Sequence, residues 1–557
     1  MGPASNTRPV ARRRILAGWL LISLAVGAAA LPGIDRLGLY YDEAFLAQQA
    51  RDFVGPAAGG THPASVRSVT LWDRPFPVRN AVYLGSLKSQ LLIPALAWAG
   101  SSPRVVRTAT LATALLALLL AMLWAARLFG EETALLMGVL VASDPTFYFF
   151  SQFEWGPFTT NFLCRSAAAL AAVMAWRSAS PARAIAGAVT AGAFLGLGVF
   201  SRADFILIPA AAAIALGLCR PDLVRQMLVE RRGALIGFAA AFSLAALPMI
   251  TSLAGLLGSA SVAGQRGDLF FRARVLWQSL DGSHFLRLME SGGLFERAAQ
   301  VDAPSGLLGW MILPAAAVLM VDGIRKYGRR ALNAPDPRAF LLVFSLLLTT
   351  LMLALPGAVR AHHQLNTLPL LHLIVASAAL TLWRREGGWG TARIRLGIAV
   401  LLTGTAVANL VLIHRTTDFI DTTGGRGRWS HALSDFAREL NARPGEAVVS
   451  LEWGFHEPLL FLTRDVPLEE STWALSRSLA SGQPWVRDAD AGTTYLVHDS
   501  PYDLFGLGPR FLMAARVAGP EIARIRSHED GAGEPAFYSV RVLGPHRVHY
   551  DGAFRIR

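Results

Sequence analysis

The sequence is poor in charge and in cysteine, and each shortage excludes a class of protein. Only 16% of the 557 residues are charged, whereas 53% are hydrophobic. Soluble domains carry about a quarter charged residues, so this composition indicates a polytopic membrane protein. The two cysteines, Cys164 and Cys219, allow neither a disulfide framework nor a cysteine zinc cluster. The more polar C-terminal part also lacks a GxGxxG fingerprint, a P-loop and a Ser/His/Asp spacing.

Positive charge is present, with a formal net charge of +13, and it lies largely in short arginine clusters between apolar runs. In a membrane protein such clusters report topology, because cytoplasmic loops are rich in Lys and Arg. We therefore expect no nucleic-acid partner. The arginines at the N-terminus precede an apolar run that resembles a signal peptide. That run is long and many others follow it, so an uncleaved first span is expected.

Apolar segments long enough to consider as spans are numerous. They cover residues 15–32, 82–100, 108–126, 132–150, 157–176, 183–200, 203–218, 233–254, 305–322, 338–356, 363–383 and 394–413. With the arginine clusters inside, both ends of segment 82–100 fall outside, so it is not a simple span. Its Lys88 and Pro94 suit a helix lying in or dipping into the outer leaflet. We expect about eleven spans, with the N-terminus inside and the C-terminus outside. The alternative is that 82–100 spans and a later segment does not.

The composition changes after Arg415, which marks a second domain. The elements expected there are an amphipathic helix and three strands, at residues 429–440, 447–451, 494–497 and 538–543. We divide the chain into a transmembrane domain, 1–415, with a first outer loop at 33–107, and a small extramembrane α/β domain, 416–557. The stretch Trp453–Glu457 is more typical of a strand-end turn than of a site.

The stretch Tyr40–Phe53, just after the first apolar run, contains the two adjacent acids on which the functional interpretation depends. Its apolar residues recur at helical spacing, and Asp42 and Glu43 open the helix. Such a helix would lie along the membrane surface. We take Asp42 and Glu43 as the candidate catalytic residues. The structural alternative for Asp42 is a helix cap.

Other ionisable residues lie at the outer ends of predicted spans, where charge is costly and usually functional. The candidate substrate-binding residues are Lys88, Arg107, Glu154, Arg202, Arg360, His362 and His363. Carboxylates and cations at one leaflet indicate a polar pocket for an anionic lipid head group. Structural alternatives are snorkelling for Lys88, a span-end anchor for Arg107 and loop solvation for Glu154. A metal at the two histidines would need a third ligand, so we predict no metal ligands.

A first span followed by Tyr41-Asp42-Glu43-Ala44 resembles the GT-C membrane glycosyltransferases. The similarity is greatest to the family 39 protein mannosyltransferases and the lipid A aminoarabinose transferases. Arg107 stands where these relatives carry an arginine at the head of the second span. The stretch Asp144–Glu154 resembles their second outer-face motif, with Glu where Asp is usual, and Arg360–His363 resembles a later outer loop.

The similarity covers roughly residues 15–415. One departure concerns the donor site. The family's His-Pro-Pro in the first outer loop is absent, and Arg74-Pro75-Phe76-Pro77 occupies that region. The fold implied is a GT-C-like polytopic helical membrane protein with the small C-terminal α/β domain in the periplasm.

The function implied is an inverting glycosyltransferase of the bacterial inner membrane. It would move a sugar from a polyprenyl-phosphate donor to an acceptor hydroxyl at the outer face, with the sugar and the acceptor open. A phosphate leaving group needs cations, for which the candidates are Lys88, Arg107, Arg202 and Arg360. Asp42 would be the general base, and Glu43 or Glu154 would orient the acceptor or help bind a divalent cation. The alternatives are a lipid-linked-sugar flippase, which would want polar groups at the midplane, and a non-catalytic envelope assembly protein.

Overall fold

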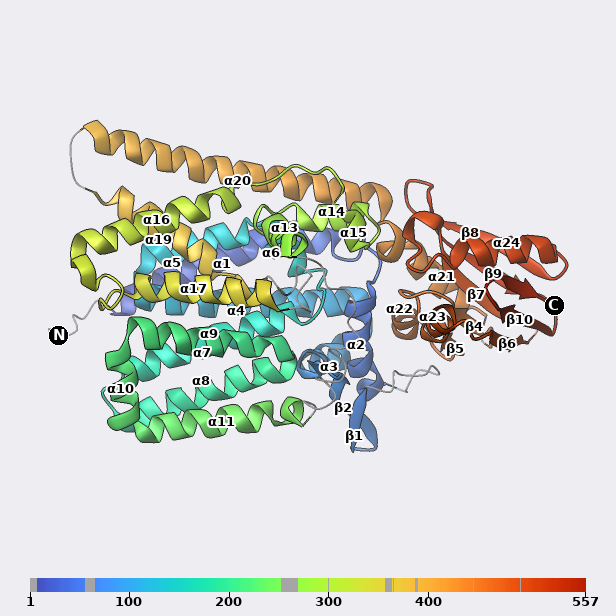
Figure 1. Ribbon diagram of the computed structural model, residues 1–557, viewed down its shortest axis with the longest axis horizontal. Coiled ribbons are helices and arrows are strands. Elements are labelled where there is room, and N and C mark those ends of the chain that lie inside the picture. Colours follow the sequence, from blue (N-terminus) through green and yellow to red (C-terminus); the bar gives the residue numbers. More distant parts are fainter. Residues whose placement is uncertain are drawn as a thin grey trace.

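The computed structural model is a bundle of long helices joined to a mixed domain of helices and strands (Figure 1). It describes residues 8–55, 66–251, 269–298, 300–355, 363, 365–385, 389–443, 445–490 and 492–557. The predicted residues Arg360 and His362 lie outside this set. In the ribbon, the N-terminus lies at the free end of the bundle and the C-terminus at the far end of the mixed domain.

Eight helices of the described residues are long and apolar enough to cross a membrane. They are α1 (Arg8–Ala30), α4 (Pro103–Phe129), α7 (Phe158–Arg177), α8 (Pro181–Ser201), α11 (Arg232–Ile250), α16 (Leu308–Tyr327), α17 (Pro337–Ala354) and α20 (Trp389–Thr423). A ninth span is formed if α9 (Leu207–Cys219) and the short α10 (Pro221–Val229), which meet at a bend of 106°, are taken together. The polytopic helical fold is thus confirmed.

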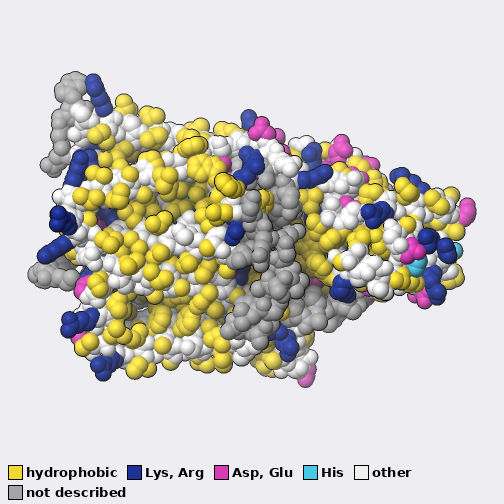
Figure 2. All heavy atoms as spheres, in the orientation of Figure 1, with side chains coloured by type: hydrophobic (Ala, Val, Ile, Leu, Met, Phe, Trp, Pro, Cys, Tyr) yellow, Lys and Arg dark blue, Asp and Glu magenta, His cyan; other side chains and the backbone are white. Residues whose placement is uncertain are grey.

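The other two predicted spans are shorter helices. Segment 132–150 divides into α5 (Glu131–Ala142) and α6 (Pro145–Phe150), because Asp144 and Pro145 interrupt the helix. Segment 363–383 yields the 14-residue α19 (Leu370–Trp383). Figure 2 shows hydrophobic side chains over the visible face of the bundle, with Lys and Arg gathered at the end away from the mixed domain.

The segment between α1 and α4, predicted as the first outer loop, folds onto the end of the bundle that faces the mixed domain (Figure 1). Its elements are α2 (Tyr41–Val54), β1 (Arg67–Leu71), β2 (Arg74–Ala81), β3 (Leu84–Gly85) and α3 (Leu87–Ala99). The strands form one antiparallel sheet in sequence order. Helix α3 has 13 residues and packs against α2 rather than crossing the bundle, in line with the expectation for segment 82–100.

Helix α2, which is expected to lie along the membrane surface, is largely buried within the protein. All its residues except Asp42 and Val54 are buried. Helix α22 (His456–Leu462) of the mixed domain packs on it, and Arg51 donates to the carbonyls of Leu460, Phe461 and Thr463 at the C-terminal end of α22. These are the carbonyls that a helix end leaves without intrahelical partners. The polar face of α2 is therefore an interdomain contact.

The mixed domain follows α20 directly, and the predicted boundary at residue 415 falls inside that helix. Its main sheet has the order β5-β4-β7-β9-β8, with β4 parallel to both neighbours and β9 antiparallel to both. The strands are β4 (Val448–Ser450), β5 (Leu468–Glu470), β7 (Thr494–His498), β8 (Ala523–Glu529) and β9 (Pro535–Val542). The remaining elements are α21 (Ala432–Asn441), α23 (Thr472–Ser481), α24 (Gly508–Ala518) and a small sheet of β6 (Trp485–Ala489), β10 (His546–Tyr550) and β11 (Phe554–Ile556).

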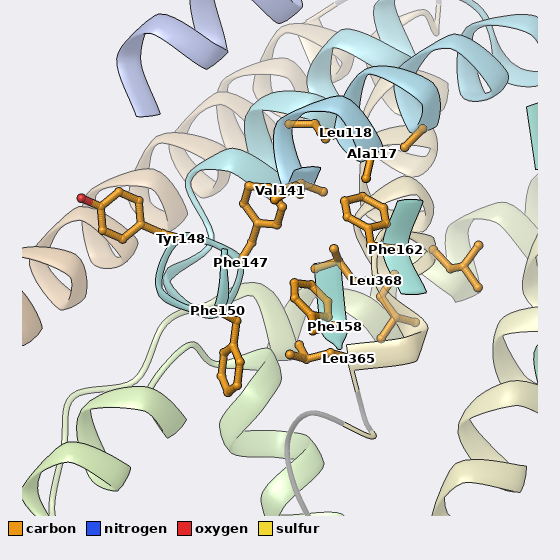
Figure 3. Packing of buried hydrophobic residues seen from close by; sticks show 14 of the residues in the cluster. Ala117, Leu118, Val141, Phe147, Tyr148, Phe150, Phe158, Phe162, Leu365 and Leu368 are labelled. Carbon is orange, nitrogen blue, oxygen red and sulfur yellow. The ribbon is translucent and has the colours of Figure 1, made fainter. Parts of the chain in front are cut away.

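An aromatic core fixes α6 and the loop that follows it. Phe147 and Phe150 of α6 and Phe158 and Phe162 of α7 are buried. In Figure 3, Phe158 and Phe162 lie beside Leu365 and Leu368, which precede α19. Each fully buried phenylalanine contributes about 1.5–3 kcal/mol. This packing anchors the two helices that flank residues 151–157.

Candidate active site

Arg107 and Glu43 form a buried ion pair at the end of the bundle. Arg107 lies in the second turn of α4, is fully buried, and its Nε and Nη2 lie 2.8 and 3.0 Å from the two carboxylate oxygens of Glu43. Its remaining donors reach the carbonyl oxygens of Ile34, Leu37 and Gly38 at 2.7–2.9 Å. One guanidinium thus ties together the end of α1, the start of α2 and the start of α4.

Lys88 and Glu154 form a second buried pair next to the first. Lys88 lies in the first turn of α3, is 3% exposed, contacts Glu154 and donates to Thr110 Oγ1 at 3.2 Å. The other carboxylate oxygen of Glu154 accepts from the backbone N–H and the hydroxyl of Thr159. Burial lowers the pKa of Lys88 to about 7, while the carboxylate of Glu43 raises it. Four sequence-predicted residues therefore meet in one cluster of two cations and two carboxylates.

The third predicted group lies at the end of α8. Arg202 Nε lies 3.1 Å from Asp204 Oδ1, and His363 Nδ1 lies 2.7 Å from Asp204 Oδ2. Arg202 Nη2 lies 2.7 Å from His363 Nε2. The same guanidinium nitrogen also contacts His363 Nδ1, so Arg202, Asp204 and His363 form one hydrogen-bonded group. The backbone of Arg202 forms a bridge with Leu84, just before α3.

Asp42 lies in the first turn of α2, directly before Glu43, and its side chain is half-buried. A helix N-terminus favours a negative charge at this position. The neighbouring aromatic residues join the two domains: Tyr40 stacks on Trp429 with centroids 4.0 Å apart, and Tyr41 lies 4.6 Å from Trp453. Asp42 is thus a partly solvent-accessible carboxylate near the boundary of the bundle and the mixed domain.

Comparison with solved structures identifies the fold. ArnT from Cupriavidus metallidurans bound to undecaprenyl phosphate matches with a TM-score of 0.55 at 12% identity, over 95% of this chain and 99% of that chain. Its apo state matches with a TM-score of 0.53 at 14% identity and the same coverage. The Archaeoglobus fulgidus oligosaccharyltransferase in complex with zinc and sulfate matches at 0.50 and 16% identity, over 81% and 62% of the two chains. No family model and no curated protein matches the sequence.

This chain has the GT-C fold. The resemblance of its Tyr-Asp-Glu-Ala helix to that superfamily is confirmed at the level of the fold, although sequence identity to these structures is low. Among the described residues of this GT-C chain, no group of three or more His, Cys, Asp or Glu side chains is placed to hold a metal ion.

Sequence reasoning missed a group of acids that the GT-C chain gathers where α2 meets α22. Glu457 of α22 is fully buried, and burial raises its pKa well above the ordinary value, with Glu470 and Asp52 adding to the shift. Burial also raises the pKa of Glu470, to about 7. Residues 453–455 form the expected turn after β4, but His456 and Glu457 open α22, and this helix brings Glu457 to α2. No local pattern in the sequence reports this contact between domains.

These acids predict a pH-dependent stability. Glu470 keeps its proton in the folded chain up to about pH 7, whereas the unfolded chain releases it near the ordinary value of 4.5. The folded state thus binds more protons between these values, and the free energy of unfolding falls as pH rises through that window, by about 3 kcal/mol at most. Glu470→Gln should flatten this dependence in thermal unfolding of the full chain. The exposed Glu521→Gln is the control and should leave the dependence unchanged.

Proposed function

We propose that this chain is an inverting glycosyltransferase that moves a sugar from a polyprenyl-phosphate donor to an acceptor hydroxyl. The observation that carries the proposal is the cluster of the buried pairs Glu43–Arg107 and Lys88–Glu154 at one end of the bundle, with the half-buried Asp42 next to Glu43 in the first turn of α2. The likeness in fold to ArnT bound to undecaprenyl phosphate supports the class of donor. Neither the sugar nor the acceptor follows from these residues.

In the proposed reaction, Asp42 accepts the proton of the acceptor hydroxyl. The acceptor oxygen forms a bond to the anomeric carbon as the bond from that carbon to the phosphate oxygen breaks. The electron pair of the broken bond stays on the polyprenyl phosphate, which leaves, and the anomeric configuration inverts. Both carboxylate oxygens of Glu43 accept hydrogen bonds from Arg107. Glu43 therefore holds the first turn of α2 in place, and this positions Asp42.

The proposed location is a bacterial inner membrane with the mixed domain in the periplasm. The gathering of Lys and Arg at the opposite end of the bundle supports this orientation, because cytoplasmic ends carry such an excess (Figure 2). Asp42 and its neighbours then lie at the outer leaflet. A sugar linked to a lipid phosphate reaches that side, whereas nucleotide sugars are made in the cytoplasm.

The proposal is tested with the purified full chain in lipid nanodiscs, supplied with labelled polyprenyl-phosphate sugars and candidate hydroxyl acceptors. Release of polyprenyl phosphate together with an inverted glycoside is the expected result. If the chain instead carries the labelled lipid across sealed vesicles without breaking the sugar–phosphate bond, it is a flippase and the transferase proposal is wrong.

The ionisation of Lys88 predicts a pH dependence of donor binding. A protonated Lys88 balances Glu154, whereas a neutral one leaves that carboxylate to repel the donor phosphate. Since its pKa is about 7, the affinity for undecaprenyl phosphate should fall as pH rises through that value. Lys88→Arg, which stays charged, should bind with little change between about pH 6 and pH 9. Identical pH profiles for the two proteins would remove Lys88 from this role.

A further inference from the structure

Each cation of the proposed active site that the structure describes is paired with a carboxylate. Arg107 is paired with Glu43, Lys88 with Glu154, and Arg202 with Asp204. A phosphodiester donor brings one negative charge, and the monoester released after transfer carries about −1.5 to −2 near neutral pH. The reaction therefore needs positive charge beyond what these balanced pairs supply.

Arg165 is a buried cation of a different kind. It lies on α7, seven residues from the end that carries Phe158, and is 9% exposed. None of its three guanidinium nitrogens has a hydrogen-bond partner within the described part of the chain. The other buried Arg and Lys side chains described here each make at least one bond to a carboxylate or a carbonyl, and they are Arg51, Lys88, Arg107, Arg202 and Arg428. Arg428 bonds through Nε to the carbonyl of Trp453, whereas its Nη1 and Nη2 have no partner among the described residues.

The side chain of Arg165 packs inside the protein rather than against lipid. Its guanidinium carbon lies 4.8 Å from the ring centroid of Phe162, one turn earlier on the same face. Phe162 belongs to the buried core beside Leu368 (Figure 3). On the same stretch of α7, the buried Asn161 Oδ1 and Ser166 Oγ also have no partner among the described residues. A buried polar group without partners is costly and points to a missing ligand.

We propose that Arg165 binds a phosphate monoester that a membrane lipid brings to the bundle, with polyprenyl phosphate as the source that the proposed function supplies. This inference rests on the proposed function for the identity of that lipid. A planar guanidinium with five free donors matches phosphate oxygens in geometry and charge. Arg165 favours the monoester over the diester, because the monoester carries the larger charge, and it thereby takes up the charge that transfer releases.

The test is equilibrium binding to the full chain in phosphatidylcholine nanodiscs. The probes are undecaprenyl phosphate, phosphatidic acid as a phospholipid monoester, phosphatidylglycerol as a diester, and uncharged undecaprenol. Arg165→Gln should weaken binding of undecaprenyl phosphate by about tenfold or more. The matched control is Arg177→Gln, an exposed arginine at the other end of the same helix, which should bind like the wild type. Undecaprenol should bind equally to all three proteins.

The two lipid sources give different results. If phosphatidic acid competes equally with undecaprenyl phosphate and loses its binding equally in Arg165→Gln, the phosphate site stands and a phospholipid head group fills it. If phosphatidic acid competes weakly, the polyprenyl carrier is the ligand. Unchanged affinity of Arg165→Gln for undecaprenyl phosphate overturns the proposal. The proposal is also overturned if Arg165→Gln loses as much affinity for phosphatidylglycerol as for undecaprenyl phosphate.

A second variant separates ligand binding from folding. Arg165→Met removes a buried, unpartnered charge and keeps the volume, so the ligand-free protein should unfold at the same or a higher temperature while undecaprenyl phosphate binding is lost. A lower unfolding temperature with intact binding would make Arg165 a structural residue and overturn the proposal. Sugar transfer is measured in the same samples. A wild type that binds through Arg165 but transfers no sugar refutes the transferase and leaves this site in place.

Discussion

Replacement of Asp42 by asparagine is expected to reduce sugar transfer by about 10²–10⁴-fold, because the amide cannot accept the proton of the acceptor hydroxyl. Asparagine has nearly the shape of aspartate and Asp42 is half-buried, so the fold should be retained. The initial rate of polyprenyl phosphate release is measured with purified protein at saturating donor. Binding of undecaprenyl phosphate should be unchanged, since the base contacts the acceptor.

The control for this prediction is Asp35→Asn. Asp35 lies seven residues earlier, its side chain is 45% exposed, and it pairs with Arg104 at the surface. Surface pairs contribute at most about 1 kcal/mol, so this variant should transfer at nearly the wild-type rate. If Asp42→Asn also keeps a near-normal rate, Asp42 is not the general base and the mechanism proposed here is wrong.

The parts of the site that the sequence could predict are those whose signal is local. Asp42 and Glu43 open a helix with a regular apolar period, and Lys88 and Arg107 are charges beside apolar runs, where a random position would be apolar. Arginine clusters gave the sidedness that excluded a simple span at 82–100. These patterns reflect only how each segment meets water or lipid, so they can be recognised without knowing which elements contact one another.

The parts that could not be predicted depend on contacts between distant segments. Arg51 stands among the polar residues of the stretch Tyr40–Phe53, yet it caps α22, more than 400 residues later. Glu457 appeared to belong to a simple turn, and its burial arises only when α22 docks on α2. Arg165 lies inside an apolar run, and the sequence does not show that its guanidinium lacks a partner among the described residues. In the mixed domain, β5, β6, β8, β10 and β11 were missed because short strands carry too little pattern.

The largest effect on stability is expected from breaking the pair of Arg107 and Glu43. Arg107→Met leaves Glu43 charged and buried and deprives the carbonyls of Ile34, Leu37 and Gly38 of their donors. Removal of one partner of a buried pair costs about 3–5 kcal/mol. Thermal unfolding of the purified full chain should show a marked fall in midpoint for this variant.

The double variant Glu43→Leu/Arg107→Met separates charge from backbone contacts. It removes the stranded carboxylate but not the three unpaired carbonyls, so its midpoint should lie between those of Arg107→Met and the wild type. Both variants should transfer sugar poorly, because α2 loses the contact that places Asp42. If the double variant is less stable than the wild type by the full sum of the losses measured for Arg107→Met and Glu43→Leu alone, the two side chains do not interact. Arg107 would then hold the loop through its carbonyl contacts alone, and Glu43 would have no part in positioning the base.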